Sequence, residues 1–177
     1  MKEWVKEMRI KHKMTKDTIP EDFTLSLAVV DAFPVLFFAG SMILIGFLFS
    51  SPLFLAGAGL CFWAGAAKVL WKIIVAARRK NIWWLFLQMR IAMPIGFVLM
   101  LLAVILNLKA IDLSAVLAAV ISVPSVFFFA AGIVGMILMG IFASKLDSSD
   151  LRSNWIEQIT NALDQAAFFI GLLLVLR

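Results

Sequence analysis

The sequence has few of the residues on which most enzyme and metal sites depend. It contains one histidine and one cysteine, His12 and Cys61, among 177 residues. Because His12 lies in the basic N-terminal segment, we expect neither a histidine-based metal site nor a Ser-His dyad within one chain. A single cysteine also excludes an intrachain disulfide.

The common motifs of nucleotide-binding, hydrolase and redox sites are missing as well. No Walker A, GxSxG, CxxC or HExxH pattern occurs. One enzymatic alternative stays open, a transferase in which Asp31 or Asp164 binds Mg²⁺ and a lipid diphosphate, although the sequence lacks a clustered Asp motif. We therefore expect a protein without a cofactor that is not an enzyme.

Charged residues are scarce, whereas apolar residues are abundant. They make up 15% and 63% of the chain, and the mean hydropathy is +1.02. Soluble domains are about one quarter charged and one half apolar, and a soluble core of this size cannot bury so much apolar surface. The apolar runs are long and continuous, which favours helices over alternating strands. The sequence predicts an all-α integral membrane protein.

Five apolar stretches are long enough to cross a bilayer, which takes about 20 helical residues. The predicted spans cover about residues 25–49, 53–77, 83–107, 115–143 and 156–176, within one transmembrane domain at 23–177. A cytoplasmic basic segment, residues 1–22, precedes them. Its first 17 residues have the spacing of an amphipathic interfacial helix, with a disordered basic tail as the alternative.

Basic residues are concentrated on one side of these spans. The N-terminal segment carries six Lys and Arg, the loop at 78–80 three and the loop at 144–155 two, against Lys109 and Arg177 on the other side. The positive-inside rule puts the N-terminus in the cytoplasm and the C-terminus outside. We expect a prokaryotic cytoplasmic membrane. The basic residues should bind anionic lipid headgroups rather than nucleic acid.

The last span has too short an apolar stretch to cross the bilayer alone. Residues 166–176 rise about 16 Å as a helix, roughly half of the hydrocarbon thickness of about 30 Å. The span must therefore include about residues 156–165, with Ser149 or Asp150 as the N-cap of the helix. This places Glu157, Asn161, Asp164 and Gln165 inside the membrane. A short re-entrant segment is the alternative.

Depth estimates of the same kind place charged side chains from four spans at one level of the inner leaflet. Because isolated charges in hydrocarbon are costly, they should face the bundle interior, water or each other. Three cations and two anions predict a cytoplasm-facing cavity that favours an anionic or zwitterionic small molecule. The candidate ligand-binding residues, called the polar layer below, are Asp31, Lys68, Lys72, Gln88, Arg90, Asn161, Asp164 and Gln165.

Structural interpretations of the polar layer remain open beside this one. Lys72 or Lys68 could snorkel to the headgroups, and Asp31 could cap a helix that restarts near Pro34. Ion pairs of Arg90 with Asp164, or of Lys68 with Asp31, could orient the helices. A small-residue ridge at Gly57, Cys61 and Gly65 predicts a close helix neighbour, in the same chain or in another copy.

The favoured function is a transporter or channel subunit. Five spans are few for a transporter, so we expect a homo-oligomer or a partner membrane subunit. The alternative is a structural or accessory membrane subunit whose intramembrane charges only pair helices.

Overall fold

The computed structural model describes residue 19 and residues 23–146 and 150–177. The predicted interfacial helix of residues 1–17 lies outside this part. The described residues form helices and no strand. In chain order these are α2 (Leu25–Phe49), α3 (Pro52–Arg78), α4 (Trp83–Leu87), α5 (Met89–Leu106), the short 3₁₀ helix η1 (Leu108–Ala110), α6 (Leu113–Ile121), α7 (Ser125–Lys145) and α8 (Leu151–Val175).

Five segments of this part of the chain are long and apolar enough to cross a membrane. They are Leu25–Phe47, Pro52–Arg78, Trp83–Leu106, Ser125–Phe142 and Leu151–Val175. The predicted fold class, an all-α integral membrane protein with five spans, is therefore confirmed for the described residues.

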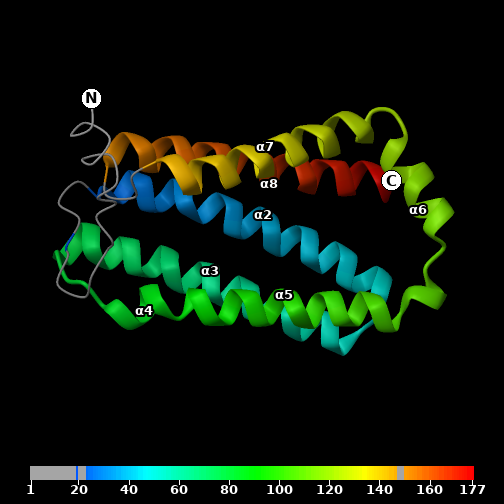
Figure 1. Ribbon diagram of the computed structural model, residues 1–177, viewed down its shortest axis with the longest axis horizontal. Coiled ribbons are helices and arrows are strands. Elements are labelled where there is room, and N and C mark those ends of the chain that lie inside the picture. Colours follow the sequence, from blue (N-terminus) through cyan, green and yellow to red (C-terminus); the bar gives the residue numbers. More distant parts are fainter. Residues whose placement is uncertain (1–18, 20–22, 147–149) are drawn as a thin grey trace, which may run out of the picture.

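The long helices lie side by side along the long axis of the molecule (Figure 1). Neighbouring helices follow the order α5, α3, α2, α8, α7, in which each packs against the next. The loop with Arg78, Arg79 and Lys80 lies where α2 and α8 begin, and we call this the basic end. The C-terminus lies at the opposite end.

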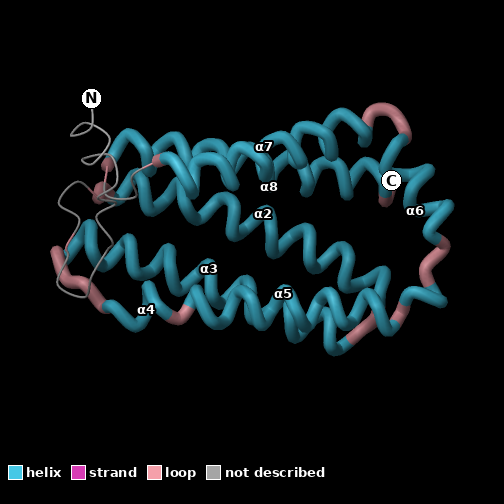
Figure 2. Tube along the Cα trace, in the orientation of Figure 1, coloured by secondary structure: helices cyan, strands magenta, loops and turns pink. Residues whose placement is uncertain are grey.

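Two of the predicted spans are interrupted. The third consists of α4 and α5, separated by a turn at Gln88 (Figure 2). The fourth, expected to run through residues 115–143, is split into α6 and α7 around Pro124. Proline has no N–H to donate and disfavours helical geometry in the residue before it, so α6 ends just ahead of it. Only the part from Ser125 onward is long enough to span a membrane.

The ridge of small residues on α3 contacts two helices of the same chain. A Cβ on Gly57 would lie 2.6 Å from the carbonyl oxygen of Gly96 on α5. Cys61 donates its thiol to the carbonyl oxygen of Met93 at 3.6 Å, also on α5. Gly65 faces α2 instead, where a Cβ would lie 3.0 Å from Val35. Small side chains let these helices approach closely, as the spacing predicted.

The last helix begins at Leu151, and Asp150 is its N-cap. One carboxylate oxygen of Asp150 accepts hydrogen bonds from the backbone N–H and the hydroxyl of Ser153, both at 2.8 Å. These bonds lower the pKa of Asp150 below its usual value of 3.8. A lowered folded-state pKa means that the cap stabilises the helix fully above the usual value and is lost as the pH falls through the lowered one.

Asp150→Ala should therefore lower the melting temperature at neutral pH, and this difference from the wild type should shrink as the pH falls below 3.8. Thermal unfolding in detergent micelles at several pH values measures it. A difference that stays constant down to the acid limit would show that the charged cap does not contribute as described.

Candidate functional site

A buried ion pair joins α2 to α3. Lys72 Nζ lies 2.9 Å from Oδ2 of Asp31, and the two side chains are only 3% and 6% exposed. Lys72 therefore does not reach the headgroups, and its interpretation as a snorkelling residue is wrong. Asp31 pairs with Lys72 rather than with Lys68.

Gln158 of α8 completes this pair. In the amide orientation that satisfies both partners, its nitrogen donates to Oδ1 of Asp31 and its oxygen accepts from Lys72 Nζ at 3.0 Å. The three buried side chains, called the ion-pair cluster below, connect α2, α3 and α8. Each charged group thus has a partner of opposite charge and an amide, the arrangement that buried ions need.

Gln158 is not among the residues predicted from the sequence, although the sequence contains a signal for it. Asn154, Gln158, Asn161 and Gln165 follow one another at intervals of four, three and four residues. At 3.6 residues per turn this spacing forms one polar stripe along a helix. This stripe indicates that Gln158 lies on the same side of the helix as Asn161 and Gln165.

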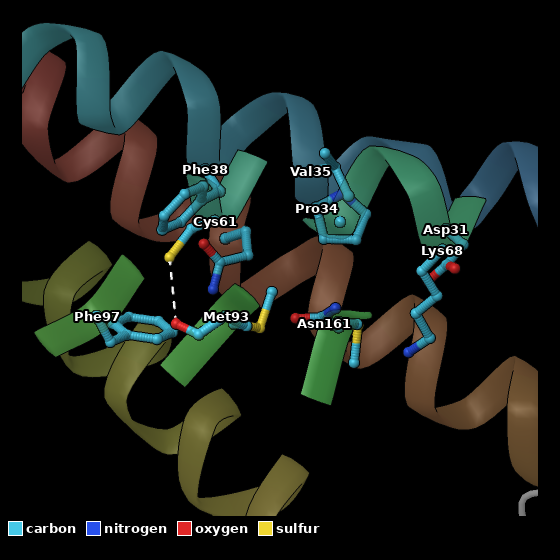
Figure 3. A pocket seen from close by; sticks show the side chains of 12 residues that line it. Asp31, Pro34, Val35, Phe38, Cys61, Lys68, Met93, Phe97 and Asn161 are labelled. Carbon is cyan, nitrogen blue, oxygen red and sulfur yellow. Dashed lines mark hydrogen bonds between the residues drawn. The ribbon is translucent and has the colours of Figure 1, made fainter. Parts of the chain in front are cut away.

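A cavity of about 250 Å³ lies next to the ion-pair cluster, between α2, α3, α5 and α8 (Figure 3). Four polar residues line it: Asp31, Lys68, Asn161 and Gln165. The remaining lining residues are Pro34, Val35, Phe38, Cys61, Gly65, Met89, Met93 and Phe97. Figure 3 shows Asp31 and Lys68 at one end, and Phe38, Cys61 and Phe97 at the other. The charged side chains therefore lie at the end of the cavity nearer the basic end, and apolar side chains predominate at the other end, where Gln165 is level with Phe38 along its helix.

Lys68 is the cation that this cavity offers to a ligand. It is partly buried and forms no ion pair with any described residue, because Lys72 occupies the carboxylate of Asp31. A smaller cavity of about 90 Å³ also contacts Lys68, together with Lys72, Gln158 and Glu157. The sequence count of three cations against two anions omitted Glu157, and with it the charges of the polar layer balance. The positive charge at the larger cavity is that of Lys68, because Lys72 neutralises Asp31.

Gln88 and Arg90 of the polar layer do not line the larger cavity. Gln88 is buried where α4 meets α5, and its amide nitrogen donates to the carbonyl oxygens of Ala64 at 3.1 Å and Leu85 at 3.2 Å. Arg90 is exposed, and its guanidinium lies over the ring of Phe86 at 5.3 Å. Gln88 thus contributes to helix packing, and Arg90 faces the exterior of the bundle.

Asp164 is also separated from the larger cavity. It is buried against α7, where its Cβ occupies the space beside Gly135. Its Oδ1 atom has no hydrogen-bond partner within the described chain. The expected ion pair between Arg90 and Asp164 does not form. The structure thus divides the polar layer: Asp31, Lys68, Asn161 and Gln165 meet in one cavity, and Lys72 adjoins it.

The chemistry available to this site is electrostatic and hydrogen-bonding. Within residues 23–146 and 150–177, no three His, Cys, Asp or Glu side chains group so that they could hold a metal ion. One ammonium group and two amides can bind an anionic group, next to an apolar chamber. The chain matches no protein-family model, no curated protein and no solved structure.

Proposed function

We propose that the protein is a transporter or channel subunit that binds a small anionic molecule in the cavity between α2, α3, α5 and α8. One observation carries this proposal: Lys68 forms no ion pair with a described residue, and it shares a cavity with two amide side chains. Because Lys72 already neutralises Asp31, that carboxylate is not free to bind the cationic part of a zwitterion. The charge balance therefore favours a simple anion.

Binding of an anion would relieve an electrostatic cost. An uncompensated ammonium group inside a membrane costs at least a few kcal/mol. A carboxylate at the polar end would accept a charge-assisted hydrogen bond from Lys68 and a further bond from Asn161. The cavity of about 250 Å³ is slightly smaller than typical ligand pockets of about 300–1,000 Å³, so the ligand should be small.

The position of the cavity is consistent with a binding site on the cytoplasmic side of a transport path. If the basic end faces the cytoplasm, as the positive-inside rule indicates, the polar end of the cavity lies in the inner leaflet. Towards the opposite end, α3 and α5 close together through Phe54, Ala58, Met100 and Ala103. A polar binding site below an apolar closed half is the form expected of one side of a gated or alternating path. A second copy or a partner subunit would complete it.

The ion-pair cluster favours a second candidate, a structural or accessory membrane subunit. The cluster holds three helices together without any ligand. For such a protein, Lys68 would be a solvated residue at the rim of the helix packing, and its replacement would change no binding property.

Lys68→Gln separates the two candidates. If Lys68 binds an anion, the affinity for the best ligand in a panel of small carboxylates should fall at least about tenfold, the effect of losing a charge-assisted hydrogen bond. Native mass spectrometry and ligand-dependent thermal shifts measure it. The melting temperature without ligand should stay close to that of the wild type.

Arg90→Gln provides the matched control, because it also removes one cation from the same depth but lies outside the cavity. It should retain wild-type affinity. Equal losses in both variants would indicate a general charge effect, and unchanged binding in Lys68→Gln would support the structural candidate.

A further inference from the structure

The larger cavity is complementary to an amphiphilic ligand, because it has charged side chains at one end and mostly apolar ones at the other. Along α2, seven residues separate Asp31 at the polar end from Phe38 at the apolar end, a rise of about 10 Å. The rings of Phe38 and Phe97 meet at the apolar end, with centroids 6.4 Å apart. A ligand that fills this space therefore carries its charge at one end and an apolar body of comparable length.

The wall of the larger cavity is interrupted on one side. Helix α2 packs against α3 and α8, and α3 packs against α5. Both α5 and α8 line the cavity, yet no Cα atom of α5 lies within 8 Å of a Cα atom of α8 in this fully described pair. Helix α7, which flanks α8, makes no such approach to α5 either. Among the helices that the structure describes, none closes the lateral seam between α5 and α8.

Phe97 locates this seam within the depth of the membrane. It lines the cavity and is nevertheless 52% exposed, so it lies at the opening. It is 14 residues after the start of the span Trp83–Leu106 and nine before its end. Both distances exceed two helical turns, so the opening faces the hydrocarbon region rather than either aqueous phase.

A second cavity, of only about 90 Å³, lies between the larger cavity and the basic end. The smaller cavity on that side contains Glu157 as well as Lys68 and Lys72. The ion-pair cluster lies beside it and already uses the charge of Lys72. A volume of about 90 Å³ is too small to admit a ligand that fills the larger cavity of about 250 Å³, so this side offers no entrance of matching size.

We infer that the ligand is a membrane-dissolved, single-chain carboxylate that enters from the bilayer through the seam between α5 and α8. This inference rests on the proposed anion site and specifies its substrate class. The carboxylate binds Lys68 and the amide of Asn161, and the hydrocarbon chain extends past Met93 towards Phe97. A monoanion suits a single ammonium group, whereas a doubly charged phosphate would leave charge uncompensated.

Photolabelling tests this inference on the full chain in lipid nanodiscs. The probe is decanoate with a diazirine at the end of its chain, and labelled peptides are mapped by mass spectrometry. We expect saturable labelling around Phe38 or Phe97. Decanoate should compete with it, whereas decanol, which has the chain without the charge, and acetate, which has the charge without the chain, should not.

Lys68→Gln should reduce the saturable labelling at least about tenfold, and Arg90→Gln should leave it unchanged. If Lys68→Gln does not fold, Asn161→Leu supplies the same test. Competition by acetate as strong as that by decanoate would overturn the lipid-soluble substrate but leave the proposed anion site intact. If neither carboxylate binds in a saturable manner, the inference and the proposed function both fail.

Discussion

Replacing Lys72 by methionine should destabilise the protein by about 3–5 kcal/mol, the cost of leaving one partner of a buried ion pair uncompensated. Methionine has a similar length, so the loss of packing is small and the loss of charge dominates. Asp31 would keep its hydrogen bond to Gln158 but lose its only ion pair with a described residue. Unfolding in detergent micelles, followed by circular dichroism, measures the change.

The double variant Lys72→Met with Asp31→Leu should recover most of this loss, because removal of both charges removes the desolvation cost. Lys80→Met is the control, since Lys80 lies exposed in the loop at the basic end, and its stability should stay within about 0.5 kcal/mol of the wild type. If the double variant is as unstable as the single one, the ion pair is not the source of the stability.

Gly57→Leu should be the second most damaging substitution, with a loss of about 3 kcal/mol, at the upper end of what overpacking costs. A Cβ at Gly57 would lie 2.6 Å from the carbonyl oxygen of Gly96 and 2.9 Å from the backbone nitrogen of Met100. Both obstacles are backbone atoms, which cannot rotate away as a side chain can. Helices α3 and α5 would have to separate, and this should lower the melting temperature and open the wall of the larger cavity.

Gly59→Leu is the matched control on the same helix. A Cβ at Gly59 meets no atom within 4 Å, so leucine there should be tolerated and even favoured by its higher helix propensity. The comparison cancels the general effect of adding a leucine to a membrane helix. Equal melting temperatures for the two variants would contradict the close packing of α3 on α5.

Lys68 and Lys72 are two lysines on the same helix with different roles. They lie one helical turn apart on α3, and both contact the smaller cavity. Lys72 is 2% exposed and belongs to the ion-pair cluster, whereas Lys68 has no ion pair within the described chain and lines the larger cavity. We therefore expect substitutions of Lys72 to change stability and those of Lys68 to change binding.

The sequence by itself determined the number of spans and the position of the polar residues along them. Both follow from one-dimensional quantities: the length of an apolar run, a rise of about 1.5 Å per residue and a hydrocarbon thickness of about 30 Å. The same quantities predict that the last helix carries Asn161 and Gln165 into the membrane, and the span Leu151–Val175 contains both. The small-residue spacing on α3 likewise predicted a close neighbour.

Only the tertiary structure decided which side of each helix these residues occupy. Successive residues of a helix point about 100° apart, so Asp164 faces Gly135 of α7 while Gln165 lines the larger cavity. Arg90 has the predicted position along its span but lies on an exposed side. The position of a residue along a helix follows from the sequence. Whether its side chain faces a cavity, another helix or the exterior depends on where the neighbouring helices lie. For this reason the polar layer read from the sequence separated into an ion-pair cluster, a ligand cavity and two residues that belong to neither.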